Sequence, residues 1–290
     1  MRVALATSAA VPRLSDDDRL LLPALHARGI RAEPAVWNAA EVSWDRYDAV
    51  VIRSCWDYHL EADRFDGWTR HLESRGIPLW NPAPVLRWNA RKTYLRDLVA
   101  AGVPTVPTRF VEPAEIADLD AVLHDTGWDE VVVKPVVSAS AYETWRAGRG
   151  RGADGERFRR LAGRMPVMVQ PFLREIERDG EWSFCFFGGQ YSHAVLKRPR
   201  PGDFRVQADH GGIYGPAEPA GWLVDQAERA LRAAGRATVY ARVDGCVIGG
   251  VLHLMELELL EPGLFLAVHP AAAGRFAGAI AATLERPAQE

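Results

Sequence analysis

Short apolar runs alternate with segments of helical spacing through the first part of the chain. Strands are predicted at the apolar runs, which are residues 2–7 (RVALAT), 32–37, 48–54 and 77–80. Residues 17–28 and 65–75 have helical spacing, and a glycine directly follows each of these segments. The alternation predicts a small parallel α/β domain over residues 1–84, with ligands expected at the carboxyl ends of its strands.

The rest of the chain mixes strands and helices in a less regular order and contains no internal repeat. Residues 81–88 (NPAPVLRW) are interrupted by prolines and predict a linker into this second part. Helices are predicted over residues 89–101, 113–126, 225–236 and 271–285. Strands are predicted over residues 108–111, 130–134, 165–170, 182–187, 190–197, 238–244 and 251–259. Residues 138–155 are polar and rich in glycine and arginine, which predicts a mobile loop.

Composition narrows the class of protein without indicating a reaction. The 290 residues are 48% hydrophobic and 25% charged, which is ordinary for a globular protein and argues against disorder. A net charge of −3 argues against a broad nucleic-acid-binding surface. The three cysteines are widely spaced and form no zinc or disulfide framework. There is no secretory signal and no run of about 18 apolar residues, so a cytoplasmic location away from membranes is expected.

Lysine is rare in this chain, because three of its 35 basic residues are lysines and the rest are arginines. The three are Lys92 on a predicted helix, and Lys134 and Lys197 at the ends of predicted strands. An ammonium is a compact and flexible point charge, so we expect these lysines where a guanidinium does not serve. A single lysine at a strand end is usually surface charge, and only the joint pattern favours a functional role.

Two late strands carry charged residues on one face. Residues i and i+2 of a strand share a face, so Arg242 lies beside Asp244, and Glu256 lies beside Glu258. Three carboxylates on neighbouring strands are suited to Mg²⁺ ions that bridge to phosphates, and the lysines with Arg205 are suited to a polyphosphate. A Glu-x-Glu strand alone is more often a solvated face. The chain has neither a Walker A sequence nor a G-x-G-x-x-G turn.

From about residue 85 to its end, the order of these residues resembles the ATP-grasp superfamily. The resemblance implies an α/β (α+β) fold in which a nucleotide lies between two α+β subdomains. Residues 1–84 stand where that superfamily has a Rossmann-like pre-ATP-grasp domain. Within the implied ATP-grasp domain, residues 85–290, the lid subdomain covers about 108–169 and the C-terminal subdomain about 170–290.

The resemblance also implies roles for individual residues. Nucleotide-binding positions are matched by Lys92, Lys134, Lys197 and Arg205 at the phosphates, Gln170, Pro171, Phe172 and Leu173 at the adenine hinge, and Glu181 at the ribose. The implied metal ligands, for one or two Mg²⁺ ions with Mn²⁺ as an alternative, are Asp244, Glu256 and Glu258. The implied catalytic residues are Arg242, which stabilises the anionic intermediate, Lys197 and Arg205.

Within the superfamily, residues 197–212 (KRPRPGDFRVQADHGG) resemble the glutathione synthetase and ribosomal-protein-S6-modifying branch. The shorter motifs RSCWDY, LWNP, WNARKTYL and MELELLEP resemble the cyclo-ligases that close O-ureido-D-serine into D-cycloserine with ATP. Two features depart from the common pattern. The loop after Lys134 lacks a dense glycine run, and Glu256 and Glu258 form a Glu-x-Glu pair where relatives usually have Glu-x-Asn.

The implied activity is that of an ATP-dependent carbon–nitrogen ligase that activates a carboxylate as an acyl phosphate and releases ADP and phosphate. The leading hypothesis is an ATP-dependent ligase that joins a carboxylate to nitrogen, and ring closure within one molecule, in antibiotic biosynthesis, is one form that this reaction can take. The alternatives are an intermolecular amino acid or peptide ligase on the same scaffold, a catalytically silent nucleotide-binding protein, and a chance match in another fold. The expected partners are ATP and a small amino-acid-like carboxylate, with no nucleic acid and no membrane. The sequence leaves monomer and homodimer open.

Substrate contacts are expected from the first domain and nearby loops, because an arginine can bind a carboxylate and an aspartate can hold an ammonium. The candidates are Arg53, Asp57, Tyr58, Ser138, His210 and Gly211. Packing at a domain interface is the alternative interpretation of the cluster around Tyr58, and His210 is equally compatible with a loop histidine. Water hydrolyses an acyl phosphate, so closure of residues 138–155 is expected during turnover.

Overall fold

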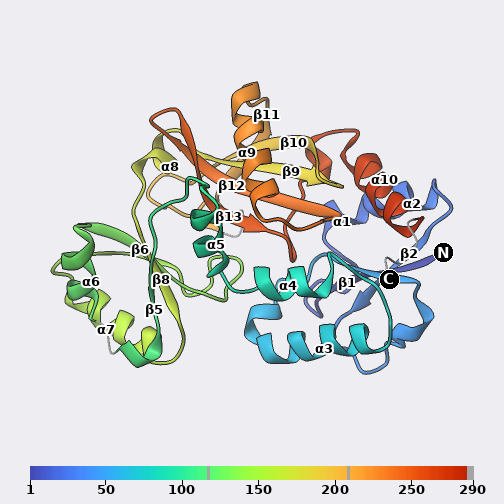
Figure 1. Ribbon diagram of the computed structural model, residues 1–290, viewed down its shortest axis with the longest axis horizontal. Coiled ribbons are helices and arrows are strands. Elements are labelled where there is room, and N and C mark those ends of the chain that lie inside the picture. Colours follow the sequence, from blue (N-terminus) through green and yellow to red (C-terminus); the bar gives the residue numbers. More distant parts are fainter. Residues whose placement is uncertain (116–117, 208–209, 286–290) are drawn as a thin grey trace.

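A computed structural model describes residues 1–115, 118–207 and 210–285 of the chain. Its strands form a first sheet (β1–β4), a lid sheet (β5–β8) and a central sheet (β9–β13), as Figure 1 shows. The three sheets follow one another along the chain, in the order of the three predicted units. The boundaries of those units, at residue 84 and near residues 108 and 169, stay predictions. Over the described ranges, no helix combines the length and the apolar character needed to cross a membrane.

The first sheet is parallel throughout and has the strand order β2-β1-β3-β4. Its strands are β1 (Arg2–Thr7), β2 (Arg31–Val36), β3 (Ala49–Ile52) and β4 (Leu79–Trp80). Successive side chains of a strand face opposite sides, so Val3 and Leu5 join one buried cluster while Ala4 and Ala6 join another. This is the parallel arrangement that the alternating pattern predicts.

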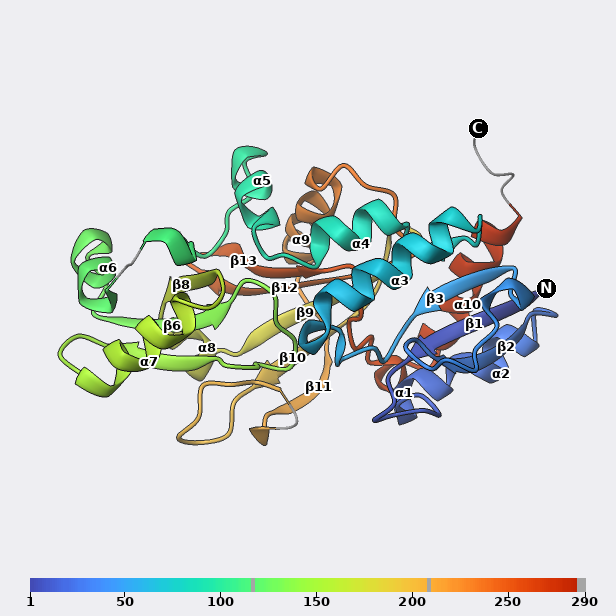
Figure 2. The same ribbon diagram turned by 90° about the horizontal axis from the view of Figure 1, so that it is seen from below.

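Helices cover both faces of the first sheet (Figure 2). One face packs against α3 (Ala62–Ser74) and α4 (Ala83–Asn89). The other face packs against α2 (Leu21–His26), which follows the short α1 (Asp16–Arg19), and the last helix, α10 (Ala272–Leu284). Phe276 of α10 stacks on Phe187 of the central sheet with 4.8 Å between ring centroids. The end of the chain therefore ties the first sheet to the central sheet.

The lid sheet is antiparallel and has the strand order β5-β8-β6-β7. Its elements are β5 (Arg109–Val111), α6 (Leu119–Thr126), β6 (Glu130–Pro135), β7 (Trp145–Gly148), α7 (Gly152–Ala162) and β8 (Val167–Pro171). Val131 and Val133 of β6 pack with Phe158 of α7 in one buried cluster. Because side chains alternate, Val132 and Lys134 point to the opposite face, where they line a cavity.

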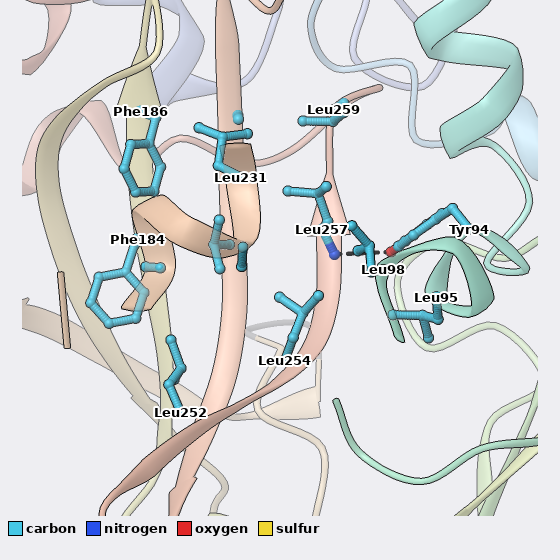
Figure 3. Packing of buried hydrophobic residues seen from close by; sticks show 14 of the residues in the cluster. Tyr94, Leu95, Leu98, Phe184, Phe186, Leu231, Leu252, Leu254, Leu257 and Leu259 are labelled. Carbon is cyan, nitrogen blue, oxygen red and sulfur yellow. Dashed lines mark hydrogen bonds between the residues drawn. The ribbon is translucent and has the colours of Figure 1, made fainter. Parts of the chain in front are cut away.

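The central sheet is antiparallel, with the strand order β11-β10-β9-β12-β13. Its strands are β9 (Glu181–Phe187), β10 (Gln190–Arg198), β11 (Ile213–Ala217), β12 (Tyr240–Ile248) and β13 (Val251–Glu258). Before it come α5 (Tyr94–Ala100) and α8 (Arg174–Arg178), and α9 (Gly221–Ala233) lies between β11 and β12. Figure 3 shows the core between this sheet, α5 and α9, where the Leu257 N–H donates to the Tyr94 hydroxyl over 2.9 Å.

A β-bulge at Met255 decides which side chains of β13 face that core. In β12, Asp244 pairs with Glu256 and the next residue, Gly245, pairs with Leu254. Met255 is therefore an extra residue in β13. Leu257 therefore shares the apolar face with Leu254. Strict alternation would put Leu254 and Glu256 on the same face. The bulge turns Glu256 and Glu258 away from the core.

Two buried asparagines hold the segment before the lid sheet against the central strands. Asn81 Nδ2 donates to the carbonyls of Tyr240 (2.9 Å) and Leu259 (2.7 Å). Asn89 Nδ2 donates to the Leu257 carbonyl, and Asn89 Oδ1 accepts from the Leu259 N–H, both over 2.7 Å. Buried backbone groups need such partners where strand pairing ends. The motifs LWNP and WNARKTYL each supply one of these asparagines.

Arg53 is a second link, between the end of β3 and the segment after β13. Its side chain is 0% exposed; Nε donates to Asp18 Oδ1 over 2.9 Å, and Nη2 donates to the Pro262 carbonyl over 2.7 Å. Ser54 Oγ also donates to Asp18. All of these groups are committed to one another, so the structure gives Arg53 a structural position in place of the expected substrate contact.

Two stretches differ from the predicted elements. Residues 138–155, predicted as a mobile loop, contain β7, because Trp145 pairs with Val133 and packs into the lid core. The predicted linker 81–88 is mostly α4, since Pro84 stands in the first turn, where a helix tolerates proline. Of the predicted helix 113–126, residues 116–117 lie outside the described residues.

Replacing Gly245 by alanine is expected to destabilise the central sheet at the bulge. A Cβ at this position would lie 2.6 Å from the His253 carbonyl oxygen and 3.0 Å from a Leu252 methyl carbon. We expect urea denaturation to show a loss of about 1–3 kcal/mol in the free energy of unfolding. Gly215→Ala, on the edge strand β11 with nothing within 4 Å of the added carbon, is the matched control. A Gly245→Ala variant as stable as Gly215→Ala would contradict the role of the bulge.

Replacing Arg53 by alanine is expected to lower stability, because it leaves the Asp18 carboxylate buried without its cation. Removing one partner of a buried ion pair costs about 3–5 kcal/mol, measurable by urea denaturation. Adding Asp18→Asn to the same chain should recover part of the loss, since the unpaired charge is then gone. An Arg53→Ala variant of unchanged stability but weakened substrate binding would instead support the sequence-based expectation.

Candidate active site

A cavity of about 720 Å³ lies where the three sheets meet, within the size range of small-molecule sites. The first sheet contributes the loop residues 15–18 together with Trp56 and Tyr58. The lid side contributes Lys134 and residues 138–141 and 170–173. The central sheet contributes its charged face, which consists of Glu181, Lys197, Arg242, Asp244, Glu256 and Glu258.

Two lysines from outside the central sheet converge on Glu256. Lys134 Nζ lies 2.6 Å from Glu256 Oε1, and Lys92 Nζ lies 3.6 Å from Glu256 Oε2. Lys92 Nζ also donates to the Ser138 carbonyl over 2.9 Å. Burial alone would raise the pKa of Glu256, but Lys134 and Lys92 outweigh it and hold that pKa well below its usual range. Glu256 is therefore a carboxylate at neutral pH.

Lys197 is buried among carboxylates of the central sheet. Its ammonium pairs with Glu181 and lies 3.5 Å from Asp244 Oδ2, and the Ser183 hydroxyl donates to Asp244 Oδ1. Burial lowers the pKa of Lys197, but Asp244 and Glu181 outweigh it and raise the pKa above its usual value. The lysine is therefore charged although it is almost enclosed.

Arg242 pairs with two of the cavity carboxylates, Asp244 and Glu258. Its Nη2 lies 2.7 Å from Asp244 Oδ2 and 2.6 Å from Glu258 Oε1, and its Nη1 donates to the Gly263 carbonyl over 2.8 Å. Burial raises the pKa of Glu258 to about 7 in spite of Arg242, because Asp244 adds like charge. Cross-strand pairing explains the grouping, since Arg242 is opposite Glu258 in the register of β12 and β13.

The hinge residues Gln170, Pro171, Phe172 and Leu173 line the cavity at the end of β8. The Arg146 guanidinium lies 3.8 Å from the centroid of the Phe172 ring and pairs with Glu130 over 2.8 Å. Gln170 Nε2 donates to the Thr108 hydroxyl over 2.9 Å, which fixes the amide beside the hinge. Arg146 therefore covers one face of an aromatic ring at the cavity wall.

The loop after β6 lines the cavity with an unusual backbone. Ser140, Ala141 and Glu143 have φ angles of 49°, 56° and 49°, in the left-handed region that glycine usually occupies. The missing glycine run noted in the sequence therefore does not prevent the loop from adopting glycine-like turns. Tyr142 also contacts His59 of the first domain, with 5.0 Å between ring centroids. The loop reaches from the lid to the first domain across the cavity.

Arg205 lies on the boundary with a second cavity of about 540 Å³. It pairs with Asp203 over 2.9 Å, and this pair lowers the pKa of the Asp203 carboxyl below its usual range. His210 and Gly211 lie outside the lining of both cavities, as far as residues 1–115, 118–207 and 210–285 show. Residues 208–209 of the motif 197–212 lie outside the described residues.

The substrate candidates divide into two groups. Tyr58 and Ser138 line the large cavity. Arg53 is held by its buried ion pair, and Asp57 Oδ1 accepts from Trp37 Nε1 over 2.9 Å, so neither side chain is part of the cavity lining that the structure describes. The segment after β3 reaches the cavity through the predicted Tyr58 and through Trp56, and a substrate contact there stays a prediction.

Several lining residues have no counterpart in the sequence-based set. Among them are Asp16, Asp17, Glu261 and Phe265. A signal existed for three of them: Asp16 and Asp17 belong to the acidic run SDDD after the first strand, and Glu261 is the third acid of MELELLEP. Burial, with Glu258 nearby, raises the pKa of Glu261 to about 8.

The donor set fits a nucleotide with its magnesium. Mg²⁺ prefers carboxylate oxygens, and phosphates are bound by lysine and arginine, which are the groups gathered here. Within the part of the chain that the structure describes, no three His, Cys, Asp or Glu side chains already form a metal cage. The carboxylates Asp244, Glu256 and Glu258 instead each pair with a cation of the same cavity. The chemistry fits, and the metal-binding role of these residues is a proposal.

Comparison with known proteins agrees with this fold. Residues 3–81 match the family described as D-cycloserine synthetase DcsG, N-terminal domain. The whole chain is 32% identical to the cycloserine biosynthesis protein DcsG of Streptomyces lavendulae, over 98% of this chain and 99% of that protein.

Solved structures of the same family and of other ligases are also similar to this chain. The crystal structure of D-cycloserine synthetase DcsG is similar with a TM-score of 0.88 and 31% identity, over 98% of this chain and 100% of that one. A D-alanine–D-alanine ligase from Bacillus anthracis matches with a TM-score of 0.70 at 18% identity, over 98% and 97% of the chains. A RimK domain ATP-grasp protein from Sphaerobacter thermophilus matches with 0.70 at 21% identity, over 97% and 100%. The fold class predicted from the sequence is confirmed, and the chain belongs to the family of the D-cycloserine synthetase DcsG, with the ATP-grasp fold.

Proposed function

We propose that this protein is an ATP-dependent carbon–nitrogen ligase that closes O-ureido-D-serine into D-cycloserine. The observation that carries the proposal is the set of paired cations and carboxylates around one cavity, in a chain that matches a D-cycloserine synthetase over 98% of its length. Phosphoryl transfer leaves a protein little covalent chemistry, so positioning and charge neutralisation are its tasks. The cavity supplies both.

Lys92, Lys134, Lys197 and Arg205 are the proposed phosphate ligands. Lys92 and Lys134 now share Glu256, and Lys197 shares Glu181 and Asp244, so each ammonium is already held at the cavity wall. Phosphate oxygens would replace these carboxylates as partners of the lysines. The exchange keeps every buried charge paired, which matters because an unpaired buried charge is costly.

The carboxylates Asp244, Glu256 and Glu258 are the proposed ligands of one or two Mg²⁺ ions, and Mn²⁺ shares the same preference for oxygen. ATP supplies the phosphoryl group that turns the substrate carboxylate into an acyl phosphate, with Mg²⁺ neutralising phosphate charge. The hinge at residues 170–173 is proposed to contact adenine, and Glu181 the ribose hydroxyls.

Arg242 is the proposed electrophilic residue of the second half-reaction. Attack of the oxygen-bound ureido nitrogen on the acyl phosphate places negative charge on the former carbonyl oxygen, and a preorganised guanidinium stabilises that charge. Collapse of this intermediate expels phosphate and closes the ring, and D-cycloserine forms when water removes the carbamoyl group from the ring nitrogen as carbon dioxide and ammonia. Bonds to Asp244, Glu258 and the Gly263 carbonyl fix the orientation of Arg242. The loop over residues 138–144, which bridges lid and first domain, would exclude water from the acyl phosphate.

The proposed function is tested by ADP release from ATP with O-ureido-D-serine as the single carboxylate. We expect turnover without any added amino acid, together with formation of D-cycloserine detected by mass spectrometry. ADP release that begins only after a second amino acid is added would favour an intermolecular ligase. Nucleotide binding without ADP release under either condition would favour a silent nucleotide-binding protein.

Lys134→Ala and Glu256→Gln are each expected to reduce ADP formation at least about 100-fold, a loss typical of removing a group that stabilises transition-state charge. The loss is measured in the ADP-release assay, with circular dichroism to show that the variants are folded. Arg160→Ala is the control, because Arg160 is an exposed cation on α7 of the lid. Activity like wild type in both cavity variants would contradict the assigned phosphate and metal site.

A further inference from the structure

The cavity has a first-domain end that the nucleotide assignment leaves without a ligand. This end is lined by Trp56 and Tyr58 from the first domain and by Glu261 from the segment after β13. The proposed nucleotide contacts belong to the lid side and the central sheet. The carboxylate substrate of a ligase has to lie beside the terminal phosphate, so this remaining end is where its other groups would lie.

Glu261 differs from the other carboxylates that line the cavity. Asp18, Glu181, Asp244, Glu256 and Glu258 each pair with a lysine or arginine. Asp16 pairs with Arg19 at the surface, and Asp17 accepts the Ala267 N–H. For Glu261, the described part of the chain provides neither an ion pair nor a hydrogen bond from another residue to its carboxylate.

The backbone around Glu261 is fixed from several sides. Four successive carbonyls accept hydrogen bonds from side chains elsewhere in the fold. Trp56 Nε1 donates to the Glu261 carbonyl over 3.1 Å, and Arg53 Nη2 donates to the next carbonyl over 2.7 Å. Arg242 Nη1 and His193 Nε2 lie 2.8 Å and 2.9 Å from the following two carbonyl oxygens. Glu261 is therefore held in place as a rigid wall residue, although its own carboxylate is unpaired.

A half-buried carboxylate without a partner is unfavourable in its charged form, and a cationic ligand would offset that cost. Trp56 and Tyr58 line the cavity near Glu261, and aromatic side chains suit the surroundings of an ammonium because the faces of their rings carry negative potential. An anion or an uncharged apolar group would gain nothing from Glu261. The ligand group that fits this wall is an ammonium.

We propose that Glu261 binds the α-ammonium group of the substrate and makes the cavity selective for amino acid carboxylates over carboxylates without an amino group. This inference rests on the proposed function, because it assumes that the substrate carboxylate is activated in this cavity. Glu261 takes the role that the sequence suggests for Asp57, whose carboxylate accepts from Trp37 instead. The selected substrate feature is its positive charge.

The test compares Glu261→Gln with wild type, since glutamine keeps the shape of the side chain and removes its charge. We expect the KM for O-ureido-D-serine to rise about 10- to 100-fold, as for loss of a charge-assisted hydrogen bond. The kcat, the KM for ATP and the melting temperature should change little. Asp120→Asn is the matched control, because Asp120 is an exposed carboxylate on α6 outside the cavity lining and should leave the substrate KM unchanged.

A substrate analogue separates ammonium binding from a structural role. The analogue 3-(ureidooxy)propanoate lacks only the amino group, so wild type should bind it as weakly as Glu261→Gln binds the full substrate. The Glu261→Gln change should then cause no further loss with the analogue. A substrate KM within twofold of wild type, or an equal loss with substrate and analogue, would overturn the proposal.

Failure of the proposed function can be told apart from failure of this inference. If wild type releases no ADP with O-ureido-D-serine, ring closure is excluded, and ligand binding still decides the role of Glu261. Calorimetry in the presence of ADP and Mg²⁺ would then compare D-serine with 3-hydroxypropanoate. A preference of wild type for D-serine that Glu261→Gln abolishes supports the inference, and no preference in wild type overturns it.

Discussion

One extra residue in β13 allows one face of the central sheet to pack in the hydrophobic core while the other face forms a charged wall of the cavity. Without the bulge at Met255, alternation would place Leu254 and Glu256 on one face, so either leucines would face solvent or carboxylates would be buried in the core. Gly245 makes the bulge possible, because a side chain there would meet the His253 carbonyl. The position of Glu256, and of everything that pairs with it, follows from this local irregularity.

Charge pairing is the second constraint, and it explains how a nearly neutral chain can form a site for a polyanion. The net charge of −3 averages a cationic group and an acidic group that are far apart in sequence and adjacent in space. Lys134 and Glu256 are separated by 122 positions and lie 2.6 Å apart. Each ion keeps the other from being buried alone, which would cost several kcal/mol. A nucleotide with its metal would exchange these partners without leaving any of them unpaired.

The cavity depends on links that join the three sheets at a distance. Asn81 and Asn89 tie the segment after the first sheet to β12 and β13, and Arg53 ties β3 to the segment that carries Glu261. These links are hydrogen bonds from side chains to backbone carbonyls, so they set the position of the chain itself. The first domain therefore positions part of the cavity wall and also contributes lining residues of its own. The hydrogen bonds that join the first domain to the central sheet therefore also fix the backbone of the cavity wall.

The sequence by itself determined the fold class, the order of most strands and longer helices, and most of the charged residues around the cavity. These follow from periodicity and from rare residues in a fixed order: three lysines in an arginine-rich chain, and two charged pairs at strand spacing. Tertiary structure alone decided the partner of each group. Arg53 and Pro262 meet across 209 positions, and Trp56 and Glu261 across 205, so local patterns hold no information about either contact. β7 forms because Trp145, within a polar segment, packs into the lid core. Glu261 stands out because, within the described residues, its carboxylate forms no ion pair although it lines the cavity.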